Sequence, residues 1–267
     1  MSNAARTAMS GQIDFTGKVV VVTGATGGLG SAICRAFAEM GASVVAGYNR
    51  SADDALALAR ALPVPGPGQV SQIGHVAVPL PVTDSAALAR SAAQVAEAFG
   101  RVDVLVNCAG TTRYVRHDDL DGLDDALIDM VLATNVRGPI AMVRAFRRLL
   151  EAADSPVIIN ISSVAARTAM GSNIAYCASK AALDNVTASL ARALAPRIRV
   201  LSVSPGLVDT DFVRAMDPAW RDMQARLTPL GRLADPAEVA TAVLVAAGAM
   251  PFTTGVAIPV DGGRPLY

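Results

Sequence analysis

Residues 19–30 read Val19-Val-Val-Val-Thr-Gly-Ala-Thr-Gly-Gly-Leu-Gly30. Four consecutive valines predict a buried strand, and the sequence after them has the pattern Gly24-x-x-x-Gly28-x-Gly30. Such glycines permit a tight turn and let another group approach the backbone closely. A helix that begins here offers free N–H groups and the positive end of its dipole to a phosphate. The stretch therefore predicts a dinucleotide site, although an ordinary strand-to-helix loop can look the same.

The rest of the chain repeats this strand-and-helix unit. Short β-branched runs alternate with alanine-rich stretches of helical length, which is typical of a parallel sheet covered by helices. Strands are expected at 18–23, 43–48, 73–79, 102–107, 156–161, 198–203 and 256–260. Helices are expected at 28–40, 51–62, 84–99, 119–150, 174–195, 212–226 and 235–248, the fourth being bent or divided at Gly138-Pro139. The predicted fold class is α/β: a single-domain, Rossmann-type doubly wound parallel sheet of about seven strands with helices on both faces.

Length and composition agree with this fold. A chain of 267 residues suits one domain, expected at 15–267, after a disordered leader at 1–14. Apolar residues make up 52% and aromatic residues only 4%, which predicts a core of Ala, Val, Leu and Ile, as in strands buried on both faces. Lys and Arg total 23, as do Asp and Glu, without a basic patch for nucleic acid.

Several other classes of protein are not indicated. The most apolar run, 239–250, is too short to span a membrane, so no membrane association is expected. The three scattered cysteines, Cys34, Cys108 and Cys177, indicate reduced thiols in a cytoplasmic protein. His75 and His117 have no companions at ligand spacing, and no metal site is expected.

A second group of residues lies downstream of the glycine turn. Tyr176 and Lys180 are four residues apart on a predicted helix and share one face. A free tyrosine has a pKa of about 10, and we expect the Lys180 ammonium to lower the pKa of Tyr176 toward neutrality. Ser163, near the end of a predicted strand, can donate to a substrate carbonyl oxygen. Tyr-x-x-x-Lys alone is also common on helix surfaces, and Ser163 is one of several hydroxyls in its turn. Together with the glycine turn, the three residues indicate a nicotinamide-dependent carbonyl or alcohol enzyme.

In its motifs the sequence resembles the short-chain dehydrogenase/reductase family over nearly its whole length. The matching motifs are TGATGGLG (23–30), NCAG (107–110), TNVRG (134–138), NISS (160–163), YCASK (176–180), PGLVDT (205–210) and VDGG (260–263). The resemblance implies the catalytic residues Asn135, Ser163, Tyr176 and Lys180. It also implies that Asn135 holds a water that connects Lys180 with solvent; from the residues alone, Asn135 could instead cap or kink its helix before Gly138.

The same resemblance implies which residues contact the cofactor. They come from the glycine turn and from the ends of later strands: Gly24, Thr26, Gly28, Leu29, Gly30, Asn49, Arg50, Ser51, Val82, Asn107, Ala109, Gly110, Tyr176, Lys180, Pro205, Gly206, Val208 and Thr210. Two positions depart from the family pattern, because Pro81 stands where an aspartate is usual and Cys108 where an asparagine is usual. Both changes leave the strength of cofactor binding open.

The residues after the second strand bear on the choice of cofactor. NAD-preferring members of the family carry an aspartate there, whereas this chain reads Tyr48-Asn-Arg-Ser51. Arg50 can pair with a 2′-phosphate, and Asn49 and Ser51 can add hydrogen bonds. A solvated arginine would look the same, and Gly27 stands where many NADP-using relatives carry a basic residue. We predict NADP(H), with NAD(H) as the alternative.

The leading hypothesis is an NADPH-dependent reductase of a 3-oxoacyl thioester or a similar small ketone. The motif Gly231-Arg232-Leu233 and the terminal VDGG look most like 3-oxoacyl-carrier-protein reductases, although polyol and steroid dehydrogenases share them. The alternatives are an NAD-dependent alcohol, polyol or steroid-type dehydrogenase and, more remotely, a nucleotide-sensing protein without turnover. Such sensing proteins usually lose a member of the Ser/Tyr/Lys set, which this chain keeps.

Further expectations concern partners and motion. The resemblance implies a homodimer or homotetramer in which the predicted helices 119–150 and 174–195 pair across subunits. An acyl-carrier partner would need a basic rim, for which the candidates are Arg113, Arg116, Arg137 and Arg214. The segment 211–232 is expected to be a mobile lid over the substrate.

Overall fold

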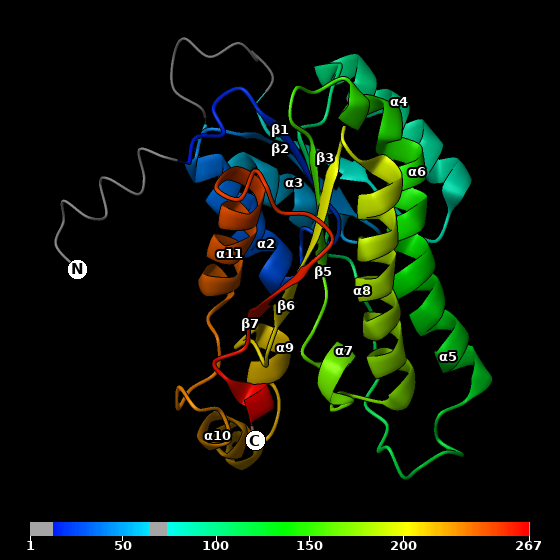
Figure 1. Ribbon diagram of the computed structural model, residues 1–267, viewed down its shortest axis with the longest axis vertical. Coiled ribbons are helices and arrows are strands. Elements are labelled where there is room, and N and C mark those ends of the chain that lie inside the picture. The colour runs from blue at the N-terminus through cyan, green and yellow to red at the C-terminus, as the bar shows by residue number, and fades with distance from the viewer. Residues whose placement is uncertain (1–12, 65–73, 267) are drawn as a thin grey trace, which may run out of the picture.

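The computed structural model describes residues 13–64 and 74–266. Within these ranges, seven parallel strands form one sheet in the order β3-β2-β1-β4-β5-β6-β7 (Figure 1). The strands are β1 (Val19–Val22), β2 (Ser43–Tyr48), β3 (Val76–Pro79), β4 (Val104–Asn107), β5 (Val157–Ile161), β6 (Arg199–Pro205) and β7 (Ala257–Val260). The predicted seven-stranded parallel sheet is confirmed. Its order reverses between β1 and β4, which is where doubly wound folds bind their ligands.

Helices cover both faces of the sheet (Figure 1). On one face lie α2 (Gly28–Glu39), α3 (Ala52–Ala61) and α11 (Pro236–Gly248), and on the other lie α4 (Ser85–Phe99), α6 (Gly138–Glu151) and α8 (Ile174–Leu194). The valines of β1 alternate between the two cores: Val20 packs with Phe37 of α2, and Val21 with Phe146 of α6. This period of two residues explains why a run of valines is needed in a strand buried on both faces.

Two of the expected boundaries, the end of the leader and the start of the third strand, lie at the limits of the described residues. Of the expected leader at 1–14, residues 1–12 lie outside the described residues. Ile13 packs against the core beside Gly248, and Asp14 accepts a hydrogen bond from the Thr16 N–H. Ile73, the expected start of the third strand, also lies outside the described residues, and β3 begins at Val76.

For the helix expected at 119–150, the predicted start is wrong, whereas the predicted division near Gly138 is found. It begins at Asp125 because Asp124 caps it, accepting the Leu127 N–H. Helix α5 (Asp125–Leu132) then passes into a π-helical turn, η1 (Ala133–Arg137), before α6 begins at Gly138. The division therefore comes from the π turn, and Pro139 occupies the first turn of α6, where proline is tolerated.

The predicted helix at 212–226 is two helices. They are α9 (Asp211–Arg214) and α10 (Pro218–Arg226), and the second starts anew because Asp217 caps it and Pro218 follows. The short helix α7 (Ala165–Thr168) after β5 was not predicted. Helices α7, α9 and α10 lie together at one end of the molecule (Figure 1).

One helical stretch, Asp125–Glu151, is long and apolar enough to cross a membrane by length and composition, a feature that the sequence analysis did not find. Its α6 part packs on the sheet through Met142, Phe146 and Leu150, which are fully buried. Apolar helices that form the core of a globular domain pass the same test of length and composition.

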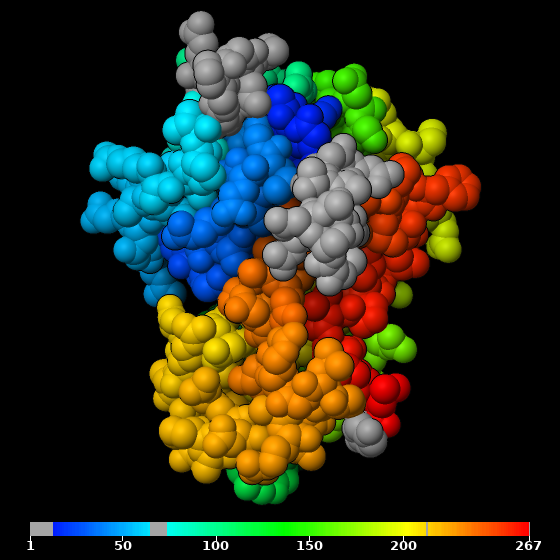
Figure 2. Space-filling model, turned by 90° about the vertical axis from the view of Figure 1, so that its left-hand side faces the viewer, coloured from blue at the N-terminus to red at the C-terminus, as the bar shows by residue number. Residues whose placement is uncertain are grey.

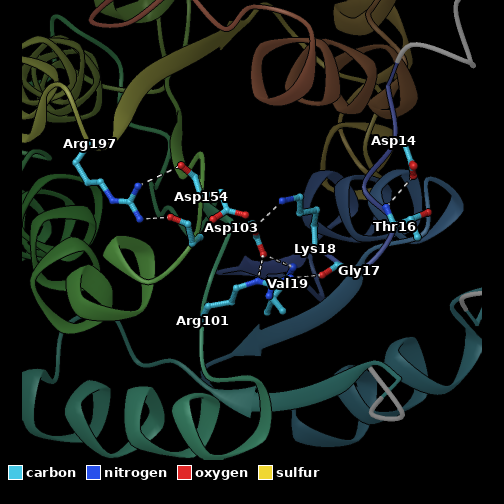
Figure 3. A network of polar contacts seen from close by, with 10 residues as sticks. Asp14, Thr16, Gly17, Lys18, Val19, Arg101, Asp103, Asp154 and Arg197 are labelled. Carbon is cyan, nitrogen blue, oxygen red and sulfur yellow. Dashed lines mark hydrogen bonds and ion pairs between the residues drawn. The ribbon is translucent and has the colours of Figure 1, made fainter. Parts of the chain in front are cut away.

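The amino end of the sheet carries a polar network of its own (Figure 3). The buried Asp103 carboxylate accepts the Val19 N–H at 2.9 Å and pairs with Lys18 and Arg101 at 3.2 and 3.1 Å. Arg101 also donates to the Gly17 carbonyl at 2.7 Å. These contacts lock the start of β1 to the start of β4, at the edge opposite the site described next.

Candidate active site

The glycine turn lies against the end of β4. Gly24 has φ +65°, and a Cβ at this residue would lie 3.0 Å from Ala109 Cα. Thr23 holds the two segments together, since its Oγ1 accepts the N–H groups of Cys108 and Ala109 at 3.0 Å each. The turn and the predicted cofactor residue Ala109 are therefore one unit, and Gly24 is the residue that permits their approach.

The geometry of the turn fits a dinucleotide. A Cβ on Gly30 would lie 2.2 Å from the Gly24 carbonyl oxygen, so the first turn of α2 has room only for hydrogen there. Gly27, which precedes α2, has no side chain that could accept the first N–H groups of the helix. The first N–H groups of α2 thus keep their hydrogen-bonding capacity for an anionic group such as a pyrophosphate. Thr26 and Leu29 belong to this same turn.

The ends of β4 and β5 are joined by buried amides. Asn107 Nδ2 donates to Asn160 Oδ1 at 2.8 Å, and Asn160 Nδ2 donates to Thr187 Oγ1 at 2.8 Å. Thr187 also meets Ser202 of β6 at 2.7 Å. Asn107 Oδ1 is buried and has no partner among the described residues. Asn107 therefore acts mainly as a link within the sheet, next to the glycine turn.

The residues expected to choose the cofactor lie at the end of β2. Asn49, Arg50 and Ser51 are all exposed, and within the described ranges Arg50 forms no ion pair. Ser51 precedes α3 without capping it. Val82 is buried and contacts Gly138 at the start of α6. The arrangement leaves the Arg50 charge available to an anionic ligand.

Helix α8 carries Tyr176 and Lys180, and a single buried residue fixes where it begins. Asn173 Oδ1 accepts the Tyr176 N–H at 2.7 Å. The Asn173 amide nitrogen donates to the Arg113 carbonyl at 2.7 Å and to Thr112 Oγ1 at 3.1 Å. The helix start is thereby tied to the loop that follows Gly110.

Lys180 is buried, and its Nζ donates to the Ile161 carbonyl at the end of β5 over 2.8 Å. Burial lowers the pKa of Lys180 to about 8, while nearby Cys108 and Asp184 oppose that shift. Cys108 is half-buried, and burial raises its pKa to about 11 against the opposing charge of Lys180. Lys180 Nζ lies 5.7 Å from the centre of the Tyr176 ring.

The pKa of Tyr176 departs from the expectation. Burial raises it, and a hydrogen bond with the Ser163 hydroxyl opposes the rise. The predicted net lowering by the Lys180 ammonium is therefore wrong for this structure, because removal of the phenol from water outweighs the favourable contacts. The Ser163 hydroxyl itself is held in its turn after β5, where it accepts the Ala165 N–H at 3.1 Å.

Asn135 lies behind this pair, within the π turn. Its Oδ1 accepts the Thr111 N–H at 2.8 Å, and its Nδ2 donates to the Thr111 carbonyl and to Ser179 Oγ, both at 3.0 Å. A Cβ on Gly110 would lie 3.4 Å from Asn135 Oδ1 and 3.7 Å from Lys180 Nζ. Asn135 and Lys180 thus both lie against the loop after β4.

The loop after β6 completes the site. A Cβ on Gly28 would lie 3.2 Å from Thr210 Cβ, which places this loop beside the glycine turn. Gly206, next to Pro205, sits against the backbone of Asp261, and Val208 forms a parallel bridge with Ala234. The loop after β6 and the glycine turn after β1 therefore lie together, through Thr210 and Gly28.

Three residues that position the site were missed. They are Thr23, Asn173 and Ser179, each of which binds the backbone of a predicted site residue. A cap signal was available for Asn173, since it stands three residues before Tyr176 at the start of a predicted helix. Among residues 13–64 and 74–266, no cluster of three or more His, Cys, Asp or Glu could hold a metal.

The arrangement suits proton exchange with a carbonyl oxygen. At neutral pH the half-buried Tyr176 is a neutral phenol that can donate its proton, and the Ser163 hydroxyl can donate a hydrogen bond to the same oxygen. Lys180 contributes a positive charge behind the ring.

Comparisons with known proteins agree with this chemistry. A family model described as enoyl-(acyl carrier protein) reductase matches residues 24–264. A D-threitol dehydrogenase from Mycolicibacterium smegmatis is 36% identical over 266 residues, covering 96% of each chain. The 3-oxoacyl-(acyl-carrier-protein) reductase FabG of Escherichia coli is 34% identical, over 94% of this chain and 98% of the relative.

A solved structure is similar as well. The gluconate 5-dehydrogenase from Burkholderia cenocepacia, in complex with NADP and tartrate, superposes with a TM-score of 0.85 at 26% identity. The match covers 97% of this chain and 99% of that structure. The protein is an oxidoreductase that belongs to the short-chain dehydrogenase/reductase family, whose members use NAD(P)(H).

Proposed function

We propose that this enzyme interconverts a small ketone and its secondary alcohol with NADP(H). The observation that supports this most strongly is the position of the buried Lys180, whose Nζ lies 5.7 Å from the centre of the Tyr176 ring and donates to the Ile161 carbonyl at the end of β5. When bound, the nicotinamide supplies or accepts the hydride. Tyr176 gives the proton to the carbonyl oxygen in reduction and removes it in oxidation, and Ser163 holds that oxygen in place.

The preference for NADP(H) rests on Arg50. Its side chain is exposed at the end of β2, without an ion pair among the described residues, and no acid occupies positions 48–51. A guanidinium with free donors pairs well with a phosphate. The gluconate 5-dehydrogenase structure that contains NADP supports the same choice.

Two substrate classes fit the relatives, a polyol and a carrier-bound 3-oxoacyl group. The D-threitol dehydrogenase and the 3-oxoacyl reductase are similar to this chain to nearly the same degree. The arginines expected to form a basic rim are engaged within the chain: Arg113 with Asp124, Arg116 with Asp118, Arg214 with Asp209, and Arg137 with the Thr83 carbonyl. Their engagement favours a small hydroxylated ketone or polyol over a substrate delivered by an acidic carrier protein.

We also propose that the chain assembles as a homodimer or homotetramer in a reducing, cytoplasmic environment. Apolar side chains are exposed on α5, α6 and α8, namely Met130, Leu132, Ile140 and Ile174. The three cysteines are free. Light scattering tests the assembly, and a monomer mass alone would refute it.

A substrate screen with both cofactors tests the activity. Initial rates are measured on four- to six-carbon polyols and ketoses and on a 3-oxoacyl thioester, with NADP(H) and NAD(H) in parallel. We expect turnover of the polyol or ketose set with NADP(H). Arg50→Ala should weaken NADP(H) about tenfold to a hundredfold and leave NAD(H) unchanged. Arg60→Ala, on the exposed last turn of α3, is the matched control. A wild-type preference for NAD(H) would remove the Arg50 argument.

A further inference from the structure

The segment 211–232 is called the lid here. It leaves the domain and returns to it at one place, the neck, where residues 207–209 pair with Ala234. The Asp209 N–H donates to the Ala234 carbonyl at 2.8 Å, and the Ala234 N–H donates to the Leu207 carbonyl at 3.1 Å. Between these contacts, the lid helix α10 contains no buried residue. Figure 2 shows the lid, in gold and orange, at one end of the molecule. A loop with a pinched neck and little burial is suited to move as a unit.

The Asp209 carboxylate reaches from the neck to both lid helices. Its Oδ2 accepts from Arg214 Nε of α9 at 3.2 Å, and its Oδ1 accepts from Arg221 Nη2 of α10 at 2.9 Å. The side chains of Asp209 and Arg221 are only 31% and 29% exposed, so this contact is shielded more than an ordinary surface pair. Arg221 Nε is buried and finds no partner among the described residues, which leaves Asp209 as the group that compensates the Arg221 charge.

The lid also borders a cavity, and it has a second set of hydrogen bonds with the C-terminal turn. A cavity of about 270 Å³ lies between the returning arm of the lid, at Leu230 and Arg232, and Leu207 of the loop after β6 with Val260 of β7. Beyond it, the Leu230 N–H donates to the Gly262 carbonyl, and Arg264 donates to Gln224 of α10 at 2.8 Å. The lid is thus fastened at Asp209 and at the C-terminal turn, with an unfilled space between the two.

Asp209 also adjoins the residue that faces the glycine turn. Thr210 follows it directly and lies close to Gly28. If a ligand at the glycine turn displaces Thr210, the backbone of Asp209 moves with it. The Asp209 carboxylate forms ion pairs with both lid helices, so the displacement reaches the lid.

We propose that Asp209 is a positioning residue that couples the loop 205–210 to both lid helices, so that cofactor binding at the glycine turn orders the lid over the substrate. The coupling rests on the proposed function in one respect, because a dinucleotide must bind beside Thr210. It assigns to Asp209 a role in substrate affinity that acts through the lid and without contact to the reacting atoms.

Hydrogen exchange of the lid amides tests this coupling. Exchange in α9, α10 and the glycine turn is followed with and without NADP⁺ in wild type, Asp209→Asn, Asp209→Glu and Asp211→Asn. The control Asp211→Asn removes the same charge two residues away, where the carboxylate is 96% exposed and meets Arg214 at 3.5 Å. Unchanged exchange in β1 shows that each variant is folded.

In wild type and Asp211→Asn, NADP⁺ should slow exchange in the glycine turn and in the lid together. In Asp209→Asn, the lid should exchange about fivefold faster without cofactor. NADP⁺ should then protect the glycine turn of this variant but not the lid, and KM for the carbonyl substrate should rise more than kcat falls. Asp209→Glu should restore part of the coupling, because it keeps the charge.

Equal lid exchange in Asp209→Asn and Asp211→Asn, with and without NADP⁺, would overturn the proposal. A failure of the proposed function looks different: NADP⁺ would then protect no segment of the wild-type protein, the glycine turn included. In that case no cofactor signal exists to be transmitted, and the proposed coupling is overturned together with the cofactor assignment.

Discussion

Asn135 Nδ2 donates a hydrogen bond to Ser179 Oγ at 3.0 Å, and Ser179 Oγ in turn donates to the Tyr176 carbonyl at 2.7 Å. Ser179 is fully buried. The π turn that holds Asn135 and the helix that holds Tyr176 are therefore connected through one hydroxyl. Since Asn135 and Tyr176 are both proposed catalytic residues, their relative position depends on a residue outside the proposed catalytic set.

Ser179→Ala should lower kcat about tenfold and leave the Kd for NADP(H) within about twofold, because it removes one of the two acceptors of the Asn135 amide and its link to the Tyr176 carbonyl. Steady-state kinetics and cofactor titration measure the two effects. Ser189→Ala, at an exposed position on the same helix, is the control and should change neither. A Ser179→Ala enzyme with wild-type kcat would show that Asn135 does not depend on this contact.

Asn173 has two separable tasks, capping α8 and binding the loop at Thr112 and Arg113. Asn173→Ala should lose both and cost about 2 kcal/mol of unfolding free energy. Both variants lose the amide donors to the loop, so kcat should be lowered in both. Asn173→Ser keeps a cap oxygen, so it should recover most of the unfolding free energy. Denaturant unfolding and kinetics separate these effects. Equal stability of the two variants would argue against a capping role.

Asp103 should matter for stability alone, because its network lies at the edge of the sheet opposite the site (Figure 3). Asp103→Ala leaves the buried Val19 N–H without its acceptor and should cost about 3 kcal/mol. Asp118→Ala breaks a pair in which both side chains are 70% exposed, and it should cost less than about 1 kcal/mol. Thermal unfolding compares them, and similar losses in the two variants would contradict this account.

The pH dependence follows from the raised pKa of Tyr176. Oxidation needs the phenolate as proton acceptor, so its kcat/KM should rise with pH, whereas reduction should fall as the phenol is lost. The hydrogen bond from Ser163 favours the phenolate and lowers the pKa, so Ser163→Ala should move the oxidation profile to higher pH as well as reduce its height. A profile displaced to lower pH would contradict the assigned contact.

The sheet could be predicted, and the catalytic set proposed, because their signals are local. The Val19–Val22 run, the glycine spacing and the Tyr176–Lys180 spacing each report on a few consecutive residues. The π turn at Ala133–Arg137 could not be predicted, since it accompanies contacts of Asn135 with Thr111 and Ser179, which are 24 and 44 residues away.

Burial explains the other misses. The direction of the Tyr176 pKa shift depends on how much of the ring the folded chain removes from water, and spacing on a helix does not contain that quantity. The start of α5 and the division of the lid helix were missed for a different reason. Asp124 and Asp217 are cap residues whose signals were present in the sequence and were outweighed by the helical pattern around them.

In the proposed function, carbonyl reduction depends on one proton, which Tyr176 must give to the substrate oxygen. Tyr176→Phe keeps the ring and removes the hydroxyl, so single-turnover absorbance of the reduced nicotinamide shows how far hydride transfer depends on that proton. The rate should fall about a thousandfold or more, with the Kd for NADP(H) unchanged within about twofold. A Tyr176→Phe enzyme that reduces its substrate at a rate near wild type would contradict the central claim.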